Sequence, residues 1–328
     1  IAEIGINHNS DVNKAVKMIY DAYYSGCECV KFQCHIPEKE MNNNAKEIIP
    51  INCNESIYSV IENCSFNEKV ELELKNLVER LGMIYLCTPF SIEAVDRLER
   101  LNVQIYKIGS GEMNNLGLVE YICKLGKPIL ISTGMNPLHK IKETVEILDK
   151  YNASYSLFHC VSMYPTPYDK VNLCGLEDLQ NEFPEVLIGL SDHSIGITSC
   201  LGAYMKGCQI FEKHYTSDKN WEGPDIEISI TPKELKNLIE QLDILKKCNL
   251  HYPRNFIQPE EENTIKFAFA TLTFNKNLNK NDIITENDIY STRPNVGDYS
   301  CNDSHLVINK KLKIDVKAGD KLFKNIFL

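Results

Sequence analysis

The stretch GLSDHSIGITSCLGAYMKGCQIFEKHY, residues 189–215, decides the fold that we expect for this chain. It reads as the end of one strand, a helix and a second strand, and the strands deliver His193 and His214 at their carboxyl ends. Two parallel strands joined in this way lie side by side or nearly so. Because side chains alternate along a strand, His193 shares a face with Ser191, and His214 shares one with Glu212.

The two histidines are candidate metal ligands. Imidazoles at matching depths on neighbouring strands can converge on one divalent ion. Each could equally be an ordinary buried histidine with a satisfied hydrogen bond. The pair by itself leaves both interpretations open.

Eight short apolar strands alternate with helical segments in the first 250 residues. We expect the strands at residues 1–6, 29–34, 83–89, 105–110, 128–134, 155–161, 187–193 and 210–215, and the helices at 12–25, 67–81, 91–101, 137–150, 195–206 and 231–247. Near-continuous apolar runs are typical of parallel strands covered on both faces. The pattern predicts an α/β fold, a closed (β/α)8 TIM barrel. Ser91 and Asn136 are expected helix N-caps.

The character of the sequence changes after the expected barrel. We expect a barrel domain at residues 1–250, a polar linker at 251–265 and a small all-β domain at 266–328, whose short β segments alternate with turns. So small a domain is near the lower size limit for independent folding, so it is expected to lean on another surface.

Composition excludes several classes of protein. The 328 residues are 43% hydrophobic and 24% charged, as in soluble globular proteins. A net charge of −10 argues against a nucleic-acid surface or a polybasic membrane patch. The 13 cysteines are scattered and form no CxxC, which indicates free thiols in a reducing cytoplasm. No apolar run approaches about 18 residues, so no membrane span is expected.

Polar side chains follow all eight expected strands at the end where barrel enzymes carry their active sites. They are Glu3, Asn7, His8, Lys31, Gln33, Thr88, Lys107, Ser110, Glu112, Ser132, Thr133, His159, Ser162, Ser191, His193, Glu212 and His214. Lys31 and Lys107 interrupt apolar strands, where an unpaired ammonium is costly, so they need anionic partners. Two lysines with several serines favour a pocket for phosphate and carboxylate. A Schiff-base lysine is an open alternative.

Carboxylates and histidines complete this chemistry. Glu3, Glu112 and Asp225 are available for proton transfer and hydroxyl recognition. A metal held by the two histidines, with open positions, would polarise a carbonyl. The residues alone predict a metal-assisted reaction between a small phosphorylated anion and a hydroxyl-rich carbonyl compound. Glu212 belongs either to the surroundings of the metal or to a structural ion pair with Lys31 or Lys107.

Seven motifs occur in a fixed order: EIGINHN, IYKIGSGEMNN, ISTGMN, YPTPY, GLSDHSIG, EKHYT and GPDI. Together they resemble the bacterial sialic acid synthase family, which includes N-acetylneuraminate synthase, over essentially the whole chain. The C-terminal part is similar to the antifreeze-like (SAF) domain of that family. The resemblance implies condensation of phosphoenolpyruvate with N-acetylmannosamine and water to N-acetylneuraminate and phosphate. A synthase for a related nonulosonate such as legionaminate is the alternative.

The resemblance also implies a mechanism and residue roles. Enolpyruvate C3 attacks the open-chain sugar aldehyde, and phosphate leaves by C–O cleavage, so a lysine-enamine aldol loses support. The metal is Mn²⁺, with Mg²⁺ or Co²⁺ possible, on His193 and His214. The phosphoenolpyruvate residues implied are Lys31, Thr88, Lys107, Ser110, Ser132, Ser162 and Ser191. Glu3 and Glu112 are implied as catalytic, with Lys31 and Lys107. The implied sugar contacts are Gln33, Asn52, Tyr164, Asp225, Phe267 and Arg293.

The same resemblance implies a homodimer in which the SAF domain of one subunit covers the barrel of the other. The chain departs from the family pattern at four places, one of which is the run STRPNVGDYS, which lacks the first glycine of the usual RPGxG. Ser162 stands where some members carry an asparagine, and Phe32 and Cys34 stand where N-acetylneuraminate synthases carry a histidine and a threonine. We expect Phe32 and Cys34 on the sugar side of the site. A catalytically inert barrel is a further alternative, but it predicts the loss of site residues that this chain retains.

Overall fold

A computed structural model of the protein describes residues 1–50 and 53–328. The chain divides into two compact units, Ile1–Asn249 and Leu250–Leu328. Each unit has its own hydrophobic core. The two units are therefore described one after the other.

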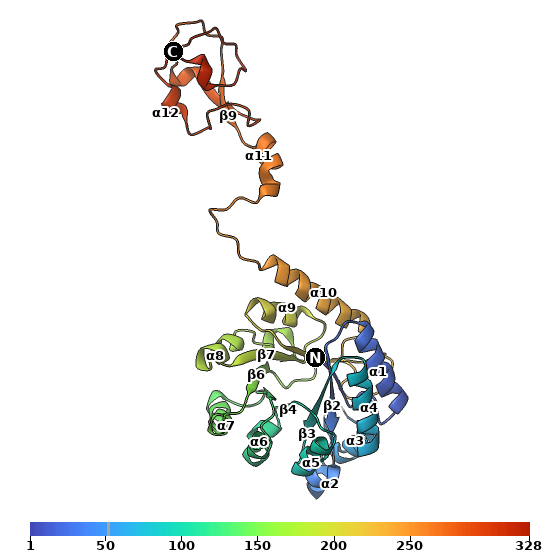
Figure 1. Ribbon diagram of the computed structural model, residues 1–328. Coiled ribbons are helices and arrows are strands. Elements are labelled where there is room, and N and C mark those ends of the chain that lie inside the picture. Colours follow the sequence, from blue (N-terminus) through green and yellow to red (C-terminus); the bar gives the residue numbers. More distant parts are fainter. Residues whose placement is uncertain (51–52) are drawn as a thin grey trace. The chain divides into compact units, whose positions relative to one another are not determined.

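The first unit is a closed barrel of eight parallel strands that follow one another in sequence order (Figure 1). They are β1 (Ala2–Gly5), β2 (Cys29–Cys34), β3 (Ile84–Pro89), β4 (Tyr106–Ile108), β5 (Ile129–Ser132), β6 (Tyr155–Cys160), β7 (Leu187–Asp192) and β8 (Phe211–His214). Strand β8 pairs with β1, where His214 lies opposite Glu3, and this pairing closes the barrel. Ser191 on β7 lies opposite Glu212 on β8. The predicted TIM barrel is confirmed, and so is the adjacency of the two histidine-bearing strands.

Helices cover the outside of the barrel (Figure 1). They are α1 (Val12–Tyr24), α2 (Pro37–Glu40), α3 (Ile57–Cys64), α4 (Glu68–Arg80), α5 (Ile92–Arg100), α6 (Leu116–Cys123), α7 (Leu138–Lys150), α8 (Gly175–Glu182), α9 (Thr198–Met205) and α10 (Pro232–Cys248). Three short 3₁₀ turns lie at Asn43–Lys46, Glu112–Asn114 and Tyr168–Lys170. The sequence pattern missed α2, α3, α6 and α8, which are only four to eight residues long.

Helix caps agree with the sequence at one predicted position and differ at the other. The Ser91 side chain accepts from the Ala94 amide and caps α5, as predicted. Asn136 does not cap α7, which begins after Pro137. Its side-chain amide instead donates to the carbonyls of Ser110 and Gly134, at 2.9 and 2.7 Å. Asn136 therefore ties the loop after β5 to the loop after β4.

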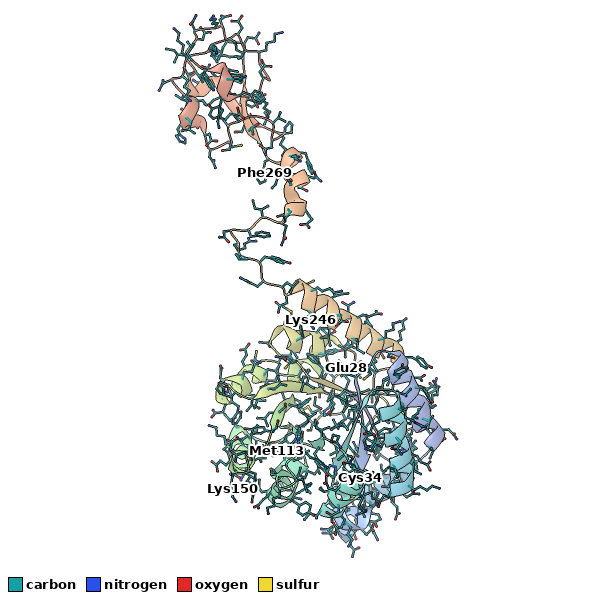
Figure 2. All side chains as sticks on the ribbon, in the orientation of Figure 1. Glu28, Cys34, Met113, Lys150, Lys246 and Phe269 are labelled. Carbon is teal, nitrogen blue, oxygen red and sulfur yellow. The ribbon has the colours of Figure 1, made fainter. Side chains whose placement is uncertain are left out.

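Alternation along β2 separates two sets of side chains. Lys31 and Gln33 face the interior of the barrel, whereas Phe32 and Cys34 are buried in the layer between strands and helices. The Phe32 ring stacks on Tyr85, with centroids 5.7 Å apart, and Cys34 lies within the body of the unit (Figure 2). The expectation that Phe32 and Cys34 lie on the sugar side is wrong, because the strand period of two turns them to the opposite face.

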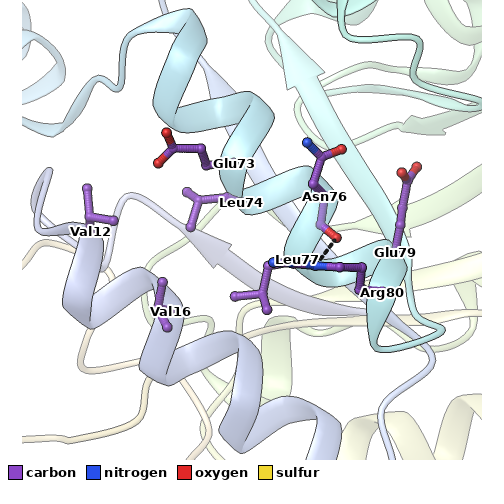
Figure 3. A pocket seen from close by; sticks show the side chains of 8 residues that line it. All are labelled: Val12, Val16, Glu73, Leu74, Asn76, Leu77, Glu79 and Arg80. Atoms are coloured by element: carbon purple, nitrogen blue, oxygen red, sulfur yellow. Dashed lines mark hydrogen bonds between the residues drawn. The ribbon is translucent and has the colours of Figure 1, made fainter.

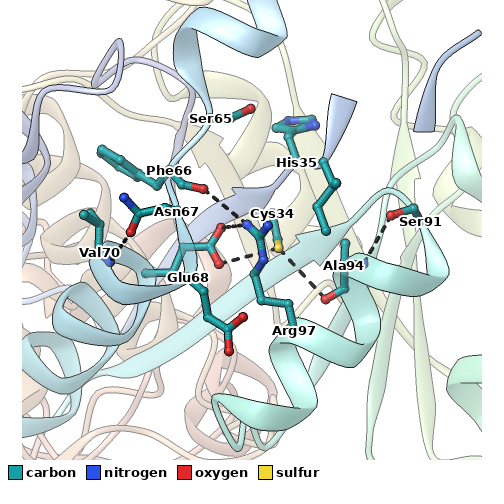
Figure 4. A network of polar contacts seen from close by, with 12 residues as sticks. Cys34, His35, Ser65, Phe66, Asn67, Glu68, Val70, Ser91, Ala94 and Arg97 are labelled. Carbon is teal, nitrogen blue, oxygen red and sulfur yellow. Dashed lines mark hydrogen bonds and ion pairs between the residues drawn. The ribbon is translucent and has the colours of Figure 1, made fainter. Parts of the chain in front are cut away.

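A polar network occupies this layer beside Cys34 (Figure 4). The Cys34 Sγ atom lies 3.7 Å from Oε2 of Glu71 on α4 and 3.9 Å from the Ala94 carbonyl oxygen. Arg97 Nη1 lies 3.4 Å from Glu71 Oε1 and donates to the Phe66 carbonyl at 3.2 Å. Burial nevertheless raises the pKa of Glu71 to about 7, because Arg97 offsets only part of the cost of desolvation.

Glutamine at position 71 is expected to flatten the dependence of stability on pH. The pKa of Glu71 in the fold is above its ordinary value of 4.5, so the folded state binds the proton more tightly than the unfolded chain. Its contribution to stability is present below pH 4.5 and is lost as the pH rises through about 7, a loss of up to about 3 kcal/mol. Melting temperatures at pH 5 and pH 8 should differ less for Glu71→Gln than for the wild type.

The control for this prediction lies on the same helix. Glu73 is exposed on α4, so Glu73→Gln should keep the pH dependence of the wild type. A pH dependence that is identical in Glu71→Gln and the wild type would contradict the raised pKa.

The second unit is small and mostly irregular. It contains α11 (Glu262–Ala268), β9 (Thr271–Phe274), β10 (Ile289–Thr292) and α12 (Ser304–Val307), with 3₁₀ turns at Pro259–Glu261, Glu286–Asp288 and Lys324–Ile326. Strands β9 and β10 pair antiparallel. The all-β domain expected from residue 266 does not begin as a strand. Residues 266–268 end helix α11, which itself begins inside the expected linker. Phe269, which follows this helix, is 56% exposed (Figure 2).

The sequence also carried expectations about the cysteines and about membrane-spanning segments. All 13 cysteines are free thiols, as their scattered positions predicted. No helix within residues 1–50 and 53–328 combines the length and the hydropathy needed to cross a membrane.

Candidate active site

A cavity of about 380 Å³ opens at the carboxyl ends of the barrel strands. It brings together every predicted site residue of the barrel unit that the structure describes. These residues are Glu3, Lys31, Gln33, Thr88, Lys107, Ser110, Glu112, Ser132, Ser162, Tyr164, Ser191, His193, His214 and Asp225. Polar residues that are far apart in the sequence, each near the end of a strand, thus share one site, as in other barrel enzymes.

Glu212 forms ion pairs with both strand lysines in the floor of this cavity. Its Oε2 lies 3.0 Å from Lys107 Nζ, and its Oε1 lies 3.3 Å from Lys31 Nζ. Lys31 also lies 3.2 Å from Glu3 Oε2. The Ser191 hydroxyl donates to Glu212 at 3.1 Å. Of the two roles left open for Glu212, the structure therefore shows the ion pair, and it serves both lysines.

The charges in this cluster hold each other in place. Burial alone would raise the pKa of Glu212, but Lys107 and Lys31 outweigh it and hold the pKa far below its ordinary value. Burial would likewise lower the pKa of Lys31, but Glu212 and Glu3 raise it overall. Burial lowers the pKa of Lys107 in spite of Glu212. Glu212 is thus a carboxylate between two cationic side chains.

Lys107 also contacts a hydroxyl that could bind an anion. Its Nζ donates to Ser132 Oγ at 2.6 Å, and it is only 1% exposed. Ser110 Oγ accepts from the Gly134 amide at 3.0 Å. A Cβ atom at Gly134 would lie 2.5 Å from Ser162 Oγ, so only glycine lets these hydroxyls approach the backbone. Lysine and serine side chains grouped in this way are suited to binding a small anion.

The two histidines meet at the rim of the same cavity. Their ring centroids are 5.4 Å apart. His193 Nδ1 donates to the Val161 carbonyl at 2.8 Å, which leaves Nε2 free to bind a ligand. His214 Nδ1 is buried, makes no hydrogen bond within the described residues, and lies 3.6 Å from Asp225 Oδ2. Burial lowers the pKa of His214 well below its ordinary value, so the ring is neutral, as metal ligation requires.

These two imidazoles fit a divalent metal ion with open positions. In the part of the chain that the structure describes, no group of three or more His, Cys, Asp or Glu side chains is arranged to hold a metal. A buried imidazole nitrogen without a partner is a cost that a bound cation would remove. The fit is therefore to a two-histidine site whose remaining ligands are water or substrate.

Two carboxyl groups that line the same cavity have raised pKa values. Burial raises the pKa of Glu112 to about 7 and that of Asp225 to about 6. Tyr164 stacks on His193, with ring centroids 4.2 Å apart. Groups with such pKa values are suited to general acid–base chemistry.

Four polar residues at strand ends do not line the cavity. Asn7 donates to the Tyr215 carbonyl, and His8 stacks on Phe66 at 4.1 Å. The Thr133 hydroxyl donates to the Phe158 carbonyl, and His159 Nε2 bonds to the Val171 carbonyl. Their position near a strand end led the sequence pattern to include them, but their side chains contact other parts of the barrel unit instead of the cavity.

Three predicted sugar contacts lie elsewhere in the chain. Asn52 lies outside the described residues. Phe267 and Arg293 belong to the second unit, where both are exposed. The cavity of the barrel gives no information on the sugar contacts predicted for Asn52, Phe267 and Arg293, so these stay predictions.

Several residues of the cavity were not predicted. His35 continues the alternation of Lys31 and Gln33 by one further step, so the period of β2 carried a usable signal. Cys160 lies 3.8 Å from His193 Nδ1. Phe90 and Met135 follow β3 and β5 in loops and also line the cavity, and no pattern in the sequence indicated them.

A larger hollow of about 810 Å³ lies on the outside of the barrel between α1 and α4 (Figure 3). It is lined by Val12, Val16, Glu73, Leu74, Asn76, Leu77, Glu79 and Arg80. Arg80 is held there by a bond to the Asn76 carbonyl at 3.2 Å. None of the predicted site residues lies in it, so size alone does not identify the active site.

Comparisons with known proteins agree with this site and fold. Residues 18–251 match the NeuB family. The chain is 36% identical to the N,N'-diacetyllegionaminic acid synthase of Campylobacter jejuni, over 90% of each protein. It is 28% identical to the human N-acetylneuraminate-9-phosphate synthase, over 99% of this chain and 91% of that protein.

A solved structure agrees as well. The N-acetylneuraminic acid synthetase of Leptospira borgpetersenii, crystallised with citrate, superposes with a TM-score of 0.72 at 32% identity, over 80% of this chain and 88% of that one. The match of the NeuB family covers most of the barrel unit and more than half of the chain. This chain belongs to the NeuB family.

Proposed function

We propose that this protein condenses phosphoenolpyruvate with N-acetylmannosamine and water, and releases N-acetylneuraminate and phosphate. One observation carries the proposal: a pair of buried lysines that share Glu212 lies in the same cavity as two converging histidines. The first group suits a small dianion, and the second suits a carbonyl compound. Three of the similar proteins, an N,N'-diacetyllegionaminic acid synthase, an N-acetylneuraminate-9-phosphate synthase and an N-acetylneuraminic acid synthetase, support the same reaction class by their names.

The anion half of the site would bind phosphoenolpyruvate. Lys31 and Lys107 would donate to its carboxylate and phosphate, with help from the hydroxyls of Thr88, Ser110, Ser132, Ser162 and Ser191. The incoming oxygens would share the ammonium groups that Glu212 now holds alone. Because the lysines are already fixed, little conformational entropy is lost on binding.

The metal half would orient the acceptor sugar. His193 and His214 would hold Mn²⁺, with Mg²⁺ or Co²⁺ as alternatives. The bound ion would polarise the aldehyde oxygen of the open-chain sugar. Gln33, Tyr164 and Asp225, which line the same cavity, would contact the sugar hydroxyls and amide.

The proposed condensation forms one C–C bond and one C–O bond and breaks one C–O bond. A new bond joins C3 of the enolpyruvate to C1 of the sugar, and the oxygen of water adds to C2. The bond between C2 and the bridging phosphate oxygen then breaks, and phosphate leaves against Lys31 and Lys107. Glu112, with a pKa of about 7, would take the proton of the attacking water, and Glu3, whose pKa burial also raises, would supply the proton that the former aldehyde oxygen gains when the C–C bond forms.

A diacetamido sugar that leads to legionaminate is the second candidate acceptor. The 36% identity to the Campylobacter legionaminic acid synthase favours it. A panel of acceptor sugars distinguishes the candidates. Phosphate release from phosphoenolpyruvate would be measured in the presence of Mn²⁺ with N-acetylmannosamine, with its 6-phosphate and with the diacetamido analogue. We expect one acceptor to give the highest kcat/KM and chelation to reduce the rate to background. Release that is indifferent to acceptor and metal, or trapping of pyruvate on a lysine by borohydride, would exclude the mechanism.

The second unit is proposed to be a SAF domain that completes the site of a partner subunit in a homodimer. Its exposed Phe267 and Arg293 support this, because aromatic and arginine side chains are enriched at the anchor points of binding surfaces. Ending the chain after Lys247 should abolish sugar turnover, while phosphoenolpyruvate still binds to the barrel. Arg293→Ala in the full chain should raise the KM for the sugar. A truncated barrel with undiminished kcat/KM would refute the role of this unit.

A further inference from the structure

A chain of four polar side chains runs along one wall of the cavity, from Glu40 through His35 and Gln33 to Glu3. Glu40 Oε1 lies 2.8 Å from His35 Nδ1. His35 Nε2 lies 2.9 Å from Gln33 Oε1. Gln33 Nε2 donates to Glu3 Oε1 at 2.9 Å. The mechanism above uses the last two residues and gives no task to His35 or Glu40.

Glu40 and His35, the first two side chains of this hydrogen-bonded series, are held in place. The side chains of His35 and Glu40 are only 3% and 6% exposed. The His35 ring stacks on Phe90, with centroids 4.1 Å apart and the planes 18° from parallel. Glu40 ends the short helix α2, and its Oε2 also accepts from the Ile36 amide at 3.3 Å. Stacking and hydrogen bonds together restrict the ring of His35 to one orientation.

Hydrogen-bond chemistry then fixes the amide of Gln33. Both oxygens of Glu40 accept, and so does Gln33 Oε1, so both ring nitrogens of His35 carry a proton and donate, and the ring is an imidazolium paired with Glu40. An amide oxygen only accepts, and an amide nitrogen only donates. If Gln33 were reversed, its oxygen would face the Glu3 carboxylate and two acceptors would be in contact. The carboxylates at the two ends of the chain therefore favour one orientation of the amide between them.

We propose that Glu40 and His35 form a positioning pair that holds the Gln33 amide in this orientation. The pair thereby sets the pattern of donors and acceptors that strand β2 offers to the acceptor sugar. The inference rests on the proposed function, in which Gln33 contacts the sugar. At the end of this series, Glu3 pairs with Lys31 of the anion half through Oε2 and not through the Oε1 atom that Gln33 contacts, and Lys107 with its partner Ser132 lies outside the series. Loss of the pair should therefore weaken the sugar half of the site and spare the anion half.

The test compares three variants of the full-length, Mn²⁺-loaded protein. His35→Phe keeps an aromatic ring on Phe90 but removes both hydrogen bonds. Glu40→Gln keeps an acceptor for Nδ1 but removes the charge. Glu38→Gln is the matched control, since Glu38 is exposed on the same helix two residues away.

We expect His35→Phe to raise the KM for the preferred acceptor about tenfold, as for the loss of a hydrogen bond to a charged group. Glu40→Gln should have a smaller effect in the same direction, and Glu38→Gln none. The KM for phosphoenolpyruvate, and its Kd from calorimetry, should stay within about twofold of the wild type in all three, because a bond not made to the anion changes its affinity little. If both KM values rise equally, or if the acceptor KM is unchanged in Glu40→Gln, the inference is wrong.

A second measurement separates this inference from the proposed function. If the wild type releases no phosphate with any acceptor, the function fails, and imidazole ¹⁵N NMR still tests the pair. The wild type should show a protonated Nδ1 on His35, and the nitrogen shifts should change in Glu40→Gln but not in Glu38→Gln. An unprotonated Nδ1, or shifts that are the same in Glu40→Gln and the wild type, would overturn the inference. Glu40→Gln also serves if His35→Phe does not fold.

Discussion

Replacing Glu212 with glutamine is expected to lower the free energy of unfolding by about 3–5 kcal/mol, the usual cost of leaving a buried ion-pair partner uncompensated. Glu212 is 5% exposed and is paired with both Lys31 and Lys107. Without it, two buried ammonium groups face a single remaining carboxylate, Glu3. Chemical denaturation of the variant and the wild type measures this loss directly.

Phosphoenolpyruvate should restore part of the stability lost in Glu212→Gln. The bound anion would supply the negative charge that the substitution removes, so the rise in melting temperature on adding the ligand should be larger in the variant than in the wild type. Glu227→Gln is the control, because Glu227 is exposed and follows the same strand. Equal stability of Glu212→Gln and the wild type would mean that the lysines do not depend on this carboxylate.

Alanine at His193 or His214 should remove metal binding and lower phosphate release about 1,000-fold or more, since Lewis-acid stabilisation contributes several kcal/mol. Each substitution leaves one imidazole, which is too few ligands to hold the ion tightly. Titration with Mn²⁺, followed by electron paramagnetic resonance, should show one bound ion per chain in the wild type and none in either variant.

His139→Ala is the control for the histidine variants, because His139 is exposed on α7 and far along the sequence from both strands. It should bind Mn²⁺ like the wild type. Bound Mn²⁺ in the double variant His193→Ala/His214→Ala would place the metal elsewhere. Full activity in that variant would remove the metal from the mechanism.

Much of the barrel and of its cavity could be predicted from the sequence, for a clear physical reason. Parallel strands covered on both sides are continuous apolar runs, so a polar residue inside such a run stands out. Lys31, Lys107 and Ser191 were found in this way, and the structure places all three in one cavity. The spacing of His193 and His214 on consecutive strands predicted their convergence because neighbouring strands are fixed in register.

Other features could not be read from the sequence because they depend on side-chain direction or on distant partners. Asn7 and His8 bond to loops, but they follow a strand just as the residues that face the cavity do. Their position in the sequence therefore did not distinguish the two kinds of residue. Glu212 could be assigned to the lysines only once the closed barrel brought side chains of β2, β4 and β8 together in its interior. Short helices such as α2 have too few residues for a clear amphipathic period.

The alternation of β2 has a consequence for how members of this family diverge. Lys31 and Gln33, at odd-numbered positions, line the cavity, whereas Val30, Phe32 and Cys34, at even-numbered positions, are buried in the core beneath the helices. Mutations at the even positions are constrained by volume, and those at the odd positions by recognition. A change of acceptor can therefore evolve without repacking the body of the protein. Phe32 and Cys34 therefore belong to the packing of the barrel wall and not to the side of β2 that faces the cavity.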